Sequence, residues 1–123
     1  MWKYRQKTGE LLDANGVVVG VGYSGIGDGR NNPAMQMVQG HGPIPVGTYS
    51  IGEAHSDPQL GPTVMRLTPD AGNEMFHRDD FFVHGDSLTH PGQASHGCIV
   101  IGPGVRLRVA GSPDKRLGVV TGA

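Results

Sequence analysis

Glycine and proline recur so often along this chain that long helices have little room to form. The 123 residues include 21 glycines and 9 prolines. Glycine loses much conformational freedom inside a helix, and proline removes a backbone donor and fixes φ, so both residue types favour turns. The runs between them are rich in β-branched and aromatic residues, which favour strands. The pattern predicts a turn-rich, mostly β fold, and the length predicts a single domain over residues 1–123.

Local patterns place the expected elements. Alternating or β-branched runs predict strands at residues 2–6, 10–12, 17–23, 48–51, 63–67, 81–83, 99–101, 105–109 and 117–120. The pair Asn15-Gly16 is a strong hairpin signal between the second and third of these strands. Gly20 and Gly22 fall on one face of their strand, where another element can approach closely. Residues 34–38 favour one or two helical turns.

Charge and hydropathy exclude several classes of protein. The formal net charge is −1, so no basic surface for nucleic acid or an anionic membrane is expected. No run of about 18 apolar residues is present, which predicts no membrane insertion. The N-terminus, MWKYRQKTGELLD, lacks the apolar core of a signal peptide, so any export would need an uncleaved route, a carrier or lysis. A single cysteine excludes an internal disulfide.

Residues 24–33, SGIGDGRNNP, form a glycine-rich segment with glycine at positions 25, 27 and 29. Loops of this kind can cradle phosphate, but no helix-forming stretch with a P-loop lysine follows. We therefore expect a structural or substrate-lining loop.

Reactive side chains concentrate in residues 81–102, FFVHGDSLTHPGQASHGCIVIG. Cys98, the only cysteine, lies between two apolar runs, and His84 precedes it by fourteen residues. A thiol is an effective nucleophile as a thiolate, whose formation a nearby imidazolium favours by lowering the thiol pKa from about 8.5. Nucleophilic catalysis also needs a base and a group that orients this base. The stretch predicts a cysteine nucleophile with a histidine base.

His96 and Gly97 add to this hypothesis. Residues two apart on a strand point the same way, so His96 and Cys98 could share a face. Gly97 permits a sharp backbone conformation and leaves room for substrate. The N–H groups of Gly97 and Cys98 could then form an oxyanion hole.

Other interpretations stay open at this point. A free cysteine is often a buried core residue, although the polar residues directly before Cys98 argue for a site. A zinc site could draw on His84, Asp86, His90, His96 and Cys98, but their spacing fits no tight zinc-ligand pattern. A papain-like arrangement is disfavoured, because there the cysteine precedes the histidine.

The motifs resemble a known enzyme family. HG at residues 84–85, followed by SHGCI at residues 95–99, is similar to the catalytic signature of L,D-transpeptidases, the YkuD-like domain. PVGTYSI at residues 45–51 looks like the PxGxYxI strand of that family. With YSGIGDGRNNPAMQ at residues 23–36, these motifs resemble a compact subfamily known from peptidoglycan-attacking effectors of type VI secretion systems.

The resemblance implies a compact β-sandwich of the L,D-transpeptidase type with one or two short helical turns. It implies acyl transfer on peptidoglycan stem peptides without a cofactor or metal, in which Cys98 attacks the carbonyl of the third residue and D-Ala leaves. The acceptor then decides between a crosslink, an exchanged D-amino acid and, with water, L,D-carboxypeptidase cleavage. The resemblance also implies secretion or delivery to the bacterial periplasm, with peptidoglycan as a partner and an immunity protein as a candidate second partner.

By the same resemblance, His84 is the base, oriented by the backbone carbonyl of Gly85, while the residues before Cys98 support the nucleophile. The expected catalytic residues are Cys98, His84, His96, Ser95, Gly85 and Gly97. The expected substrate-binding residues are Asp86, Tyr23, Ser24 and Tyr49. Asp86 could position His84 or bind a substrate amine, and it could equally cap a loop.

Two departures from the family pattern bear on the product. Where the family usually has Arg or Asn soon after the cysteine, this chain has Val100 and Ile101, and the nearest basic residue is Arg106. The segment from His84 to Cys98 is also short for a covering lid. We therefore expect cleavage or D-amino-acid exchange rather than efficient crosslinking. The alternative is a non-catalytic peptidoglycan-binding module with the same fold.

Overall fold

Short strands dominate the structure, as the glycine-rich sequence predicts. The computed structural model describes residues 1–122. Its strands are β1 (Trp2–Arg5), β2 (Glu10–Leu12), β3 (Val18–Val21), β4 (Tyr23–Ser24), β5 (Gly47–Ile51), β6 (His55–Asp57), β7 (Gly61–Pro69), β8 (Phe81–His84), β9 (Ile99–Val100) and β10 (Arg116–Val120). Helical elements are α1 (Pro103–Ala110) and two 3₁₀ turns, η1 (Gly27–Gly29) and η2 (Pro33–Met35). The mostly β prediction is confirmed.

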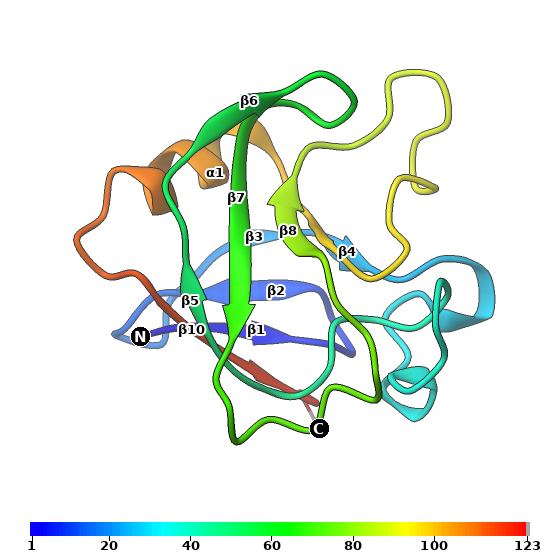
Figure 1. Ribbon diagram of the computed structural model, residues 1–123. Helices are drawn as coiled ribbons and strands as arrows, with labels where there is room; N and C mark the ends of the chain where they lie inside the picture. Colours follow the sequence, from blue (N-terminus) through cyan, green and yellow to red (C-terminus); the bar gives the residue numbers. More distant parts are fainter. Residues whose placement is uncertain (123) are drawn as a thin grey trace.

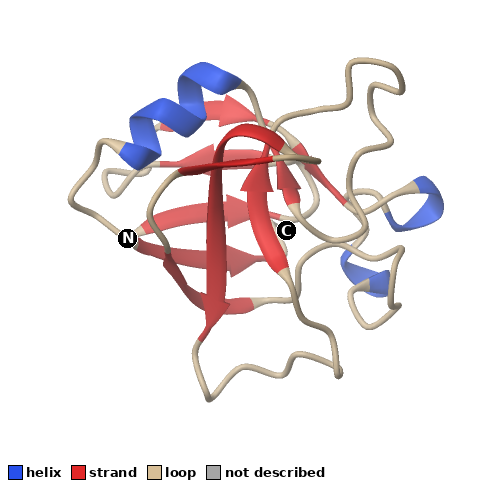
Figure 2. Cartoon of the chain, turned by 45° about the horizontal axis from the view of Figure 1, so that its top comes forward, coloured by secondary structure: helices blue, strands red, loops and turns tan. Residues whose placement is uncertain are grey.

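The strands form a ten-stranded sheet in the order β3-β2-β1-β10-β5-β7-β8-β9-β4, with β6 paired to β7. The two ends of this path, β3 and β4, are consecutive in the chain, so the sheet is nearly closed. Figure 1 shows β7 and β8 passing in front of β1, β2 and β3, which gives the body a sandwich-like form. Figure 2 shows α1 at one end of the strands and the two short turns at the other.

The hydrophobic core lies between the two halves of the curled sheet. Its buried side chains include Trp2, Tyr4, Ile44, Tyr49, Met65, Leu67, Phe81, Val83, Ile99, Leu117 and Val119. β1 pairs in parallel with β10, with Trp2 opposite Leu117 and Arg5 opposite Val120. Both terminal strands are therefore held in the middle of the sheet.

The parallel pair β8–β9 places the reactive residues. Val83 lies opposite Ile99, and both face the core. His84 lies opposite Val100 in the same register. Because successive side chains on a strand alternate between faces, His84 and Cys98 are both directed to the face of the sheet away from the core.

The predicted strand at residues 105–109 is wrong, because this segment lies in helix α1. Pro103 at its start has the φ of a helix and lacks an N–H that would go unbonded there anyway. The apparent alternation of VRLRV also misidentified the inner face: Arg106 is 6% exposed, whereas Leu107 is 61% exposed. Arg106 and Val109 are buried three residues apart, which is the spacing of a helix face. No helix among residues 1–122 has the length and apolar character needed to cross a membrane.

Several other predicted elements lie close to the positions expected from the sequence. β2 and β3 form the antiparallel hairpin expected around Asn15-Gly16. The predicted strand at 17–23 is interrupted at Gly22, which separates β3 from β4. The close approach expected there is present, because a Cβ on Gly22 would lie 2.0 Å from the carbonyl oxygen of Val100. The helical turn expected at 34–38 begins earlier and is the short 3₁₀ turn η2.

Replacement of Gly22 tests this close approach. Gly22→Ala is expected to lower the free energy of unfolding by about 3 kcal/mol or more, because the added methyl group meets fixed backbone. Gly104→Ala is the matched control, since a Cβ on this helical residue meets nothing within 4 Å. It should be neutral or stabilising by up to about 1 kcal/mol. Urea unfolding measures both, and equal midpoints for the two variants would contradict the packing described.

Candidate active site

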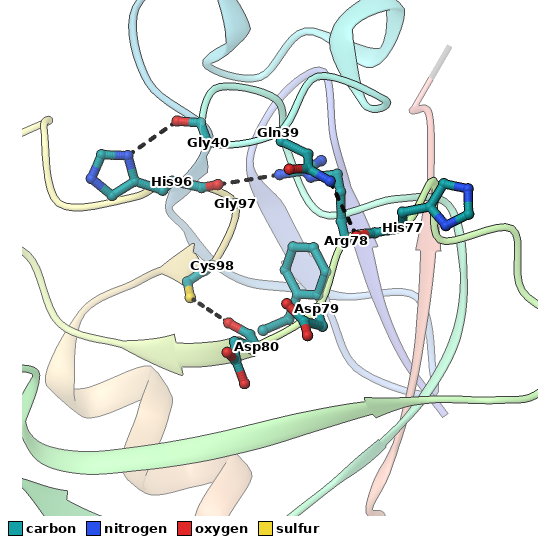
Figure 3. Close-up of a pocket in the computed structure, with 10 residues that line it drawn as sticks. Gln39, Gly40, His77, Arg78, Asp79, Asp80, His96, Gly97 and Cys98 are labelled. Atoms are coloured by element: carbon teal, nitrogen blue, oxygen red, sulfur yellow. Dashed lines mark hydrogen bonds between the residues drawn. The ribbon is translucent and has the colours of Figure 1, made fainter.

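Cys98 lies directly before β9 at the edge of a cavity of about 300 Å³. The cavity is lined by Gln39, Gly40, His77, Arg78, Asp79, Asp80, Phe81, His96, Gly97 and Cys98. The Sγ atom points to the carbonyl oxygen of Asp80, 3.7 Å away (Figure 3). The thiol therefore reaches a cavity on the face of the sheet opposite to the core.

The thiol is not activated in this arrangement. Burial raises the pKa of Cys98 to about 11, and the charge of Asp80 acts in the same direction. A hydrogen bond from the backbone of Phe82 and the charge of Arg78 oppose this rise in pKa. The sequence suggested a pKa lowered by an imidazolium. In the structure the pKa is raised instead, because desolvation of the charged form is the largest effect.

His84 is a buried, oriented imidazole at the end of β8. Its Nδ1 lies 2.7 Å from the carbonyl oxygen of Gly85. A carbonyl only accepts, so Nδ1 carries the hydrogen and Nε2 of the neutral ring has a free lone pair. Burial lowers the pKa of His84, and the nearby charge of Arg106 lowers it further, although the bond to Gly85 raises it. At neutral pH His84 is therefore an uncharged ring able to accept a proton at Nε2.

His84 and Cys98 share a sheet face, but their side chains bond to different groups. His84 lies opposite Val100, two residues along the strand from Cys98. Among the described residues, no hydrogen bond joins the imidazole to Sγ, which is directed to Asp80 instead. His84 lines a second cavity of about 960 Å³, and His96 lines both cavities. The structure therefore holds the thiol and the imidazole on one face of the sheet, with the thiol directed to Asp80.

His96 does not lie where a base for Cys98 would be needed. Its Nδ1 contacts the carbonyl oxygen of Gly40 at 3.1 Å. Figure 3 shows the ring directed away from Sγ. The two side chains do not converge despite their spacing in sequence, because the backbone at Gly97 has φ of +140° and is not a regular strand.

Ser95 organises the backbone around the cysteine. Its Oγ donates to the carbonyl oxygen of Cys98 at 2.6 Å and accepts from the N–H groups of Gly25 and Gly97 at 2.9 and 3.1 Å. The N–H of Gly97 is therefore occupied by Ser95, which corrects its assignment to an oxyanion hole in this conformation. Ser95 is buried, so its role is to position the backbone that carries Cys98.

Arg78 is a residue that the sequence analysis missed. Its guanidinium group is buried and donates to the carbonyl oxygens of Gln36, Gly42, Pro43 and His96. A Cβ on Gly97 would lie 2.5 Å from its Nη2 atom, so the room expected beside Gly97 is filled by this arginine. Arg78 lies in a polar, irregular segment without a motif, and the hydrogen-bond partners of its guanidinium group are all distant in sequence. No local signal could have identified it.

Two expected substrate-binding residues are structural. Ser24 is fully buried, where its Oγ donates to the carbonyl oxygen of Gly97 at 2.8 Å and accepts from the N–H of Ile44 at 2.9 Å. Tyr49 is fully buried in the core and donates to the carbonyl oxygen of Pro45 at 2.6 Å. This bond gives the tyrosine of the PVGTY motif a structural role. The prediction that Ser24 and Tyr49 bind substrate is therefore corrected.

Tyr23 and Asp86 brace the loop between β8 and β9. The Tyr23 hydroxyl donates to Asp86 Oδ1 at 2.6 Å and accepts from the N–H of Ala94 at 3.0 Å. The Asp86 carboxylate also accepts from the N–H groups of Ser87 and Gly92. Of the roles considered for Asp86, loop capping is the one that these contacts describe.

The zinc alternative lacks a ligand set. Within residues 1–122, no group of three or more His, Cys, Asp or Glu side chains is arranged to hold a metal ion. His84, His96 and Cys98 point to three different backbone carbonyls.

Arg106 brings a positive charge to the larger cavity from helix α1. It is buried beside Gly85, where a Cβ would lie 2.7 Å from its Nη2 atom. The strand predicted at 105–109 would have placed Arg106 on the polar outer face, so the sequence did not predict its position at the cavity.

Comparison with known protein families matches residues 19–112 to the Tlde1 domain. The chain belongs to the Tlde1 domain family. This is a type VI secretion effector family that targets peptidoglycan. The match covers both motif regions and most of the described sheet. Searches among curated proteins and among solved structures returned no match for the chain.

The raised pKa of Cys98 can be tested by alkylation in the isolated Tlde1 domain. Iodoacetamide labelling is expected to accelerate about tenfold per pH unit from about pH 7 to about pH 10, since the thiolate fraction keeps rising below its pKa. The folded thiol should show no plateau there, because its pKa is about 11. The urea-unfolded chain is the control and should level off above the ordinary value of about 8.5. A plateau at the same pH in both states would contradict the structure.

Proposed function

We propose that residues 1–123 form a single catalytic domain that performs cysteine-dependent acyl transfer on peptidoglycan stem peptides. The observation that carries the proposal is the pairing of β8 with β9, which directs His84 and Cys98 to one face of the sheet. The hydrogen bond from His84 Nδ1 to the Gly85 carbonyl supports the base role, because it leaves Nε2 free to accept a proton.

The reaction begins with rotation of Sγ from the Asp80 carbonyl towards His84. The thiol proton passes to Nε2 as sulfur attacks the peptide carbonyl, since neither a thiol with pKa about 11 nor a buried imidazole favours a preformed ion pair. The protonated imidazole then gives this proton to the amine of the departing D-Ala, and an acyl-thioester remains on Cys98. Water or a D-amino acid attacks the thioester, His84 takes the proton of the attacking group, and the proton returns to sulfur.

The tetrahedral oxyanion needs backbone donors near Cys98. The N–H of Cys98 is the proposed donor, because the N–H of Gly97 is bonded to Ser95. The Gly97 carbonyl is also fixed by Ser24, so this backbone segment is held in one conformation. Ser24 and Ser95 are therefore positioning residues in this mechanism.

Cleavage and D-amino-acid exchange are the proposed outcomes rather than crosslinking. Where the larger family carries Arg or Asn soon after the cysteine, this chain has Val100 and Ile101, and both are buried. As a member of an effector family, the domain is proposed to act in the periplasm of a target bacterium. An immunity protein that covers the two cavities is the proposed protein partner.

A non-catalytic peptidoglycan-binding module is the second candidate function. The observation that favours it is the resting thiol, which is bonded to the Asp80 carbonyl and has a raised pKa. This candidate predicts binding to sacculi without turnover.

Alanine variants test the roles of the three residues. Wild-type protein should release D-Ala from a muropeptide with a tetrapeptide stem, as followed by mass spectrometry. Cys98→Ala should abolish release, and His84→Ala should reduce it about 10²- to 10⁴-fold, the usual contribution of a general base. His96→Ala should have a smaller effect, because its ring points away from Sγ.

His55→Ala is the matched control, since His55 is exposed on β6 and lines neither cavity. Folding of each variant is checked by thermal unfolding. Undiminished D-Ala release by folded Cys98→Ala would reject the nucleophile, and binding of sacculi by an inactive wild type would establish the second candidate.

A further inference from the structure

Arg106 is a buried cation that lacks an acidic partner. Its Nε atom donates to the carbonyl oxygen of Ile101 at 2.9 Å, and its Nη1 atom donates to those of Pro62 and Thr63 at 2.7 and 3.3 Å. No ion pair within residues 1–122 involves this guanidinium group. Removing a charge from water without a counter-ion is costly, and burial lowers the pKa of Arg106 accordingly.

The remaining amino group, Nη2, makes no hydrogen bond in the described structure. It packs against Gly85, and the arginine lines the larger cavity together with His84. Asp86, the acidic residue lining this cavity, is bonded to Tyr23 and to loop N–H groups. A positively charged donor therefore lies next to the imidazole without a protein acceptor.

Arg78 provides an internal comparison. It is buried to a similar extent, but each of its terminal amino groups donates to two carbonyl oxygens. Arg78 is thus committed to holding the backbone. Arg106 holds the backbone with Nε and Nη1 and keeps one amino group for another acceptor.

We infer that Nη2 of Arg106 binds the α-carboxylate of the terminal amino acid of the substrate, beside His84. This inference rests on the proposed acyl transfer and names the part of the substrate that it recognises. In a peptide with a free C-terminus, the carboxylate and the scissile nitrogen are attached to the same α-carbon. A carboxylate held at Nη2 therefore places that nitrogen next to the imidazole that must protonate it.

The same site accounts for both outcomes of the reaction. In exchange, the acceptor is a free amino acid whose amine and carboxylate have the same spacing as those of the leaving group. The carboxylate anchor thus selects terminal residues as leaving groups and free amino acids as acceptors. A peptide whose last residue is amidated lacks the charge that the site requires.

Paired substrates on wild-type protein test the inference without any mutation. The probes are a stem tetrapeptide with a free C-terminus and its C-terminal carboxamide, with D-methionine and D-methioninamide as acceptors. The acid should be favoured at least about tenfold in kcat/KM for release and for exchange, since an anion is lost from a buried cationic site. Equal rates for acid and amide would overturn the inference while leaving the acyl transfer in place.

Substitutions on α1 then test whether Arg106 causes the preference for the acid over the amide. Arg106→Gln and Arg106→Lys should bring the acid-to-amide ratio towards one, with the lysine variant retaining part of it. Arg108→Gln is the matched control, because this neighbouring arginine on the same helix is 58% exposed and pairs with Asp13. A ratio unchanged in folded Arg106 variants would overturn the assignment.

Binding separates failure of the anchor from failure of the reaction. Cys98→Ala protein is titrated with the tetrapeptide acid and its amide and followed by NMR. Tighter binding of the acid than of the amide, lost in the double variant Cys98→Ala/Arg106→Gln, supports the anchor. This result would support the anchor even if the wild type showed no turnover, and only the proposed acyl transfer would then fail. Equal binding of acid and amide counts against the anchor.

Discussion

The buried guanidinium group of Arg78 is the interaction on which the site depends. Its terminal amino groups donate to the carbonyl oxygens of Gln36, Gly42 and Pro43 and to that of His96, two residues before Cys98. Loss of these bonds would leave several buried carbonyls without partners, each costing about 1–3 kcal/mol. The loop that carries Cys98 is therefore fixed by a side chain whose terminal amino groups both donate to backbone carbonyls.

The same arginine holds a strained segment against the thiol. Phe76, His77 and Asp80 all have positive φ, between 55° and 61°, which is uncommon for residues other than glycine. Such conformations persist where the surroundings impose them. Arg78 lies within this segment, two residues before Asp80, whose carbonyl oxygen faces Sγ. Arg78 therefore joins the segment that faces the thiol to the backbone at His96.

The sequence predicted the candidate nucleophile, its neighbouring strand and most of the sheet, because these predictions depend on local patterns and motifs. It could not identify the roles of Arg78 and Arg106, because most of their hydrogen-bond partners are far away in the chain. The two motif glycines show the difference. The carbonyl of Gly85 was expected to orient His84 and lies next to its Nδ1, whereas Gly97 was expected to leave space for substrate. The sequence did not show that each glycine packs against one of these guanidinium groups. Ser24 and Tyr49 were assigned to substrate binding because the sequence does not show whether a polar side chain bonds to buried backbone or to a ligand. In the structure both hydroxyl groups donate to backbone carbonyls.

Detection of an acyl-enzyme tests the central claim most directly. Wild-type protein is mixed with tetrapeptide, quenched in acid at successive times and measured by intact-protein mass spectrometry. The account predicts an adduct with the mass of the substrate acyl group without D-Ala, located on Cys98 by peptide mapping and discharged by D-methionine. Release of D-Ala with no acylated Cys98 at any time, or with the acyl group on another residue, would contradict it.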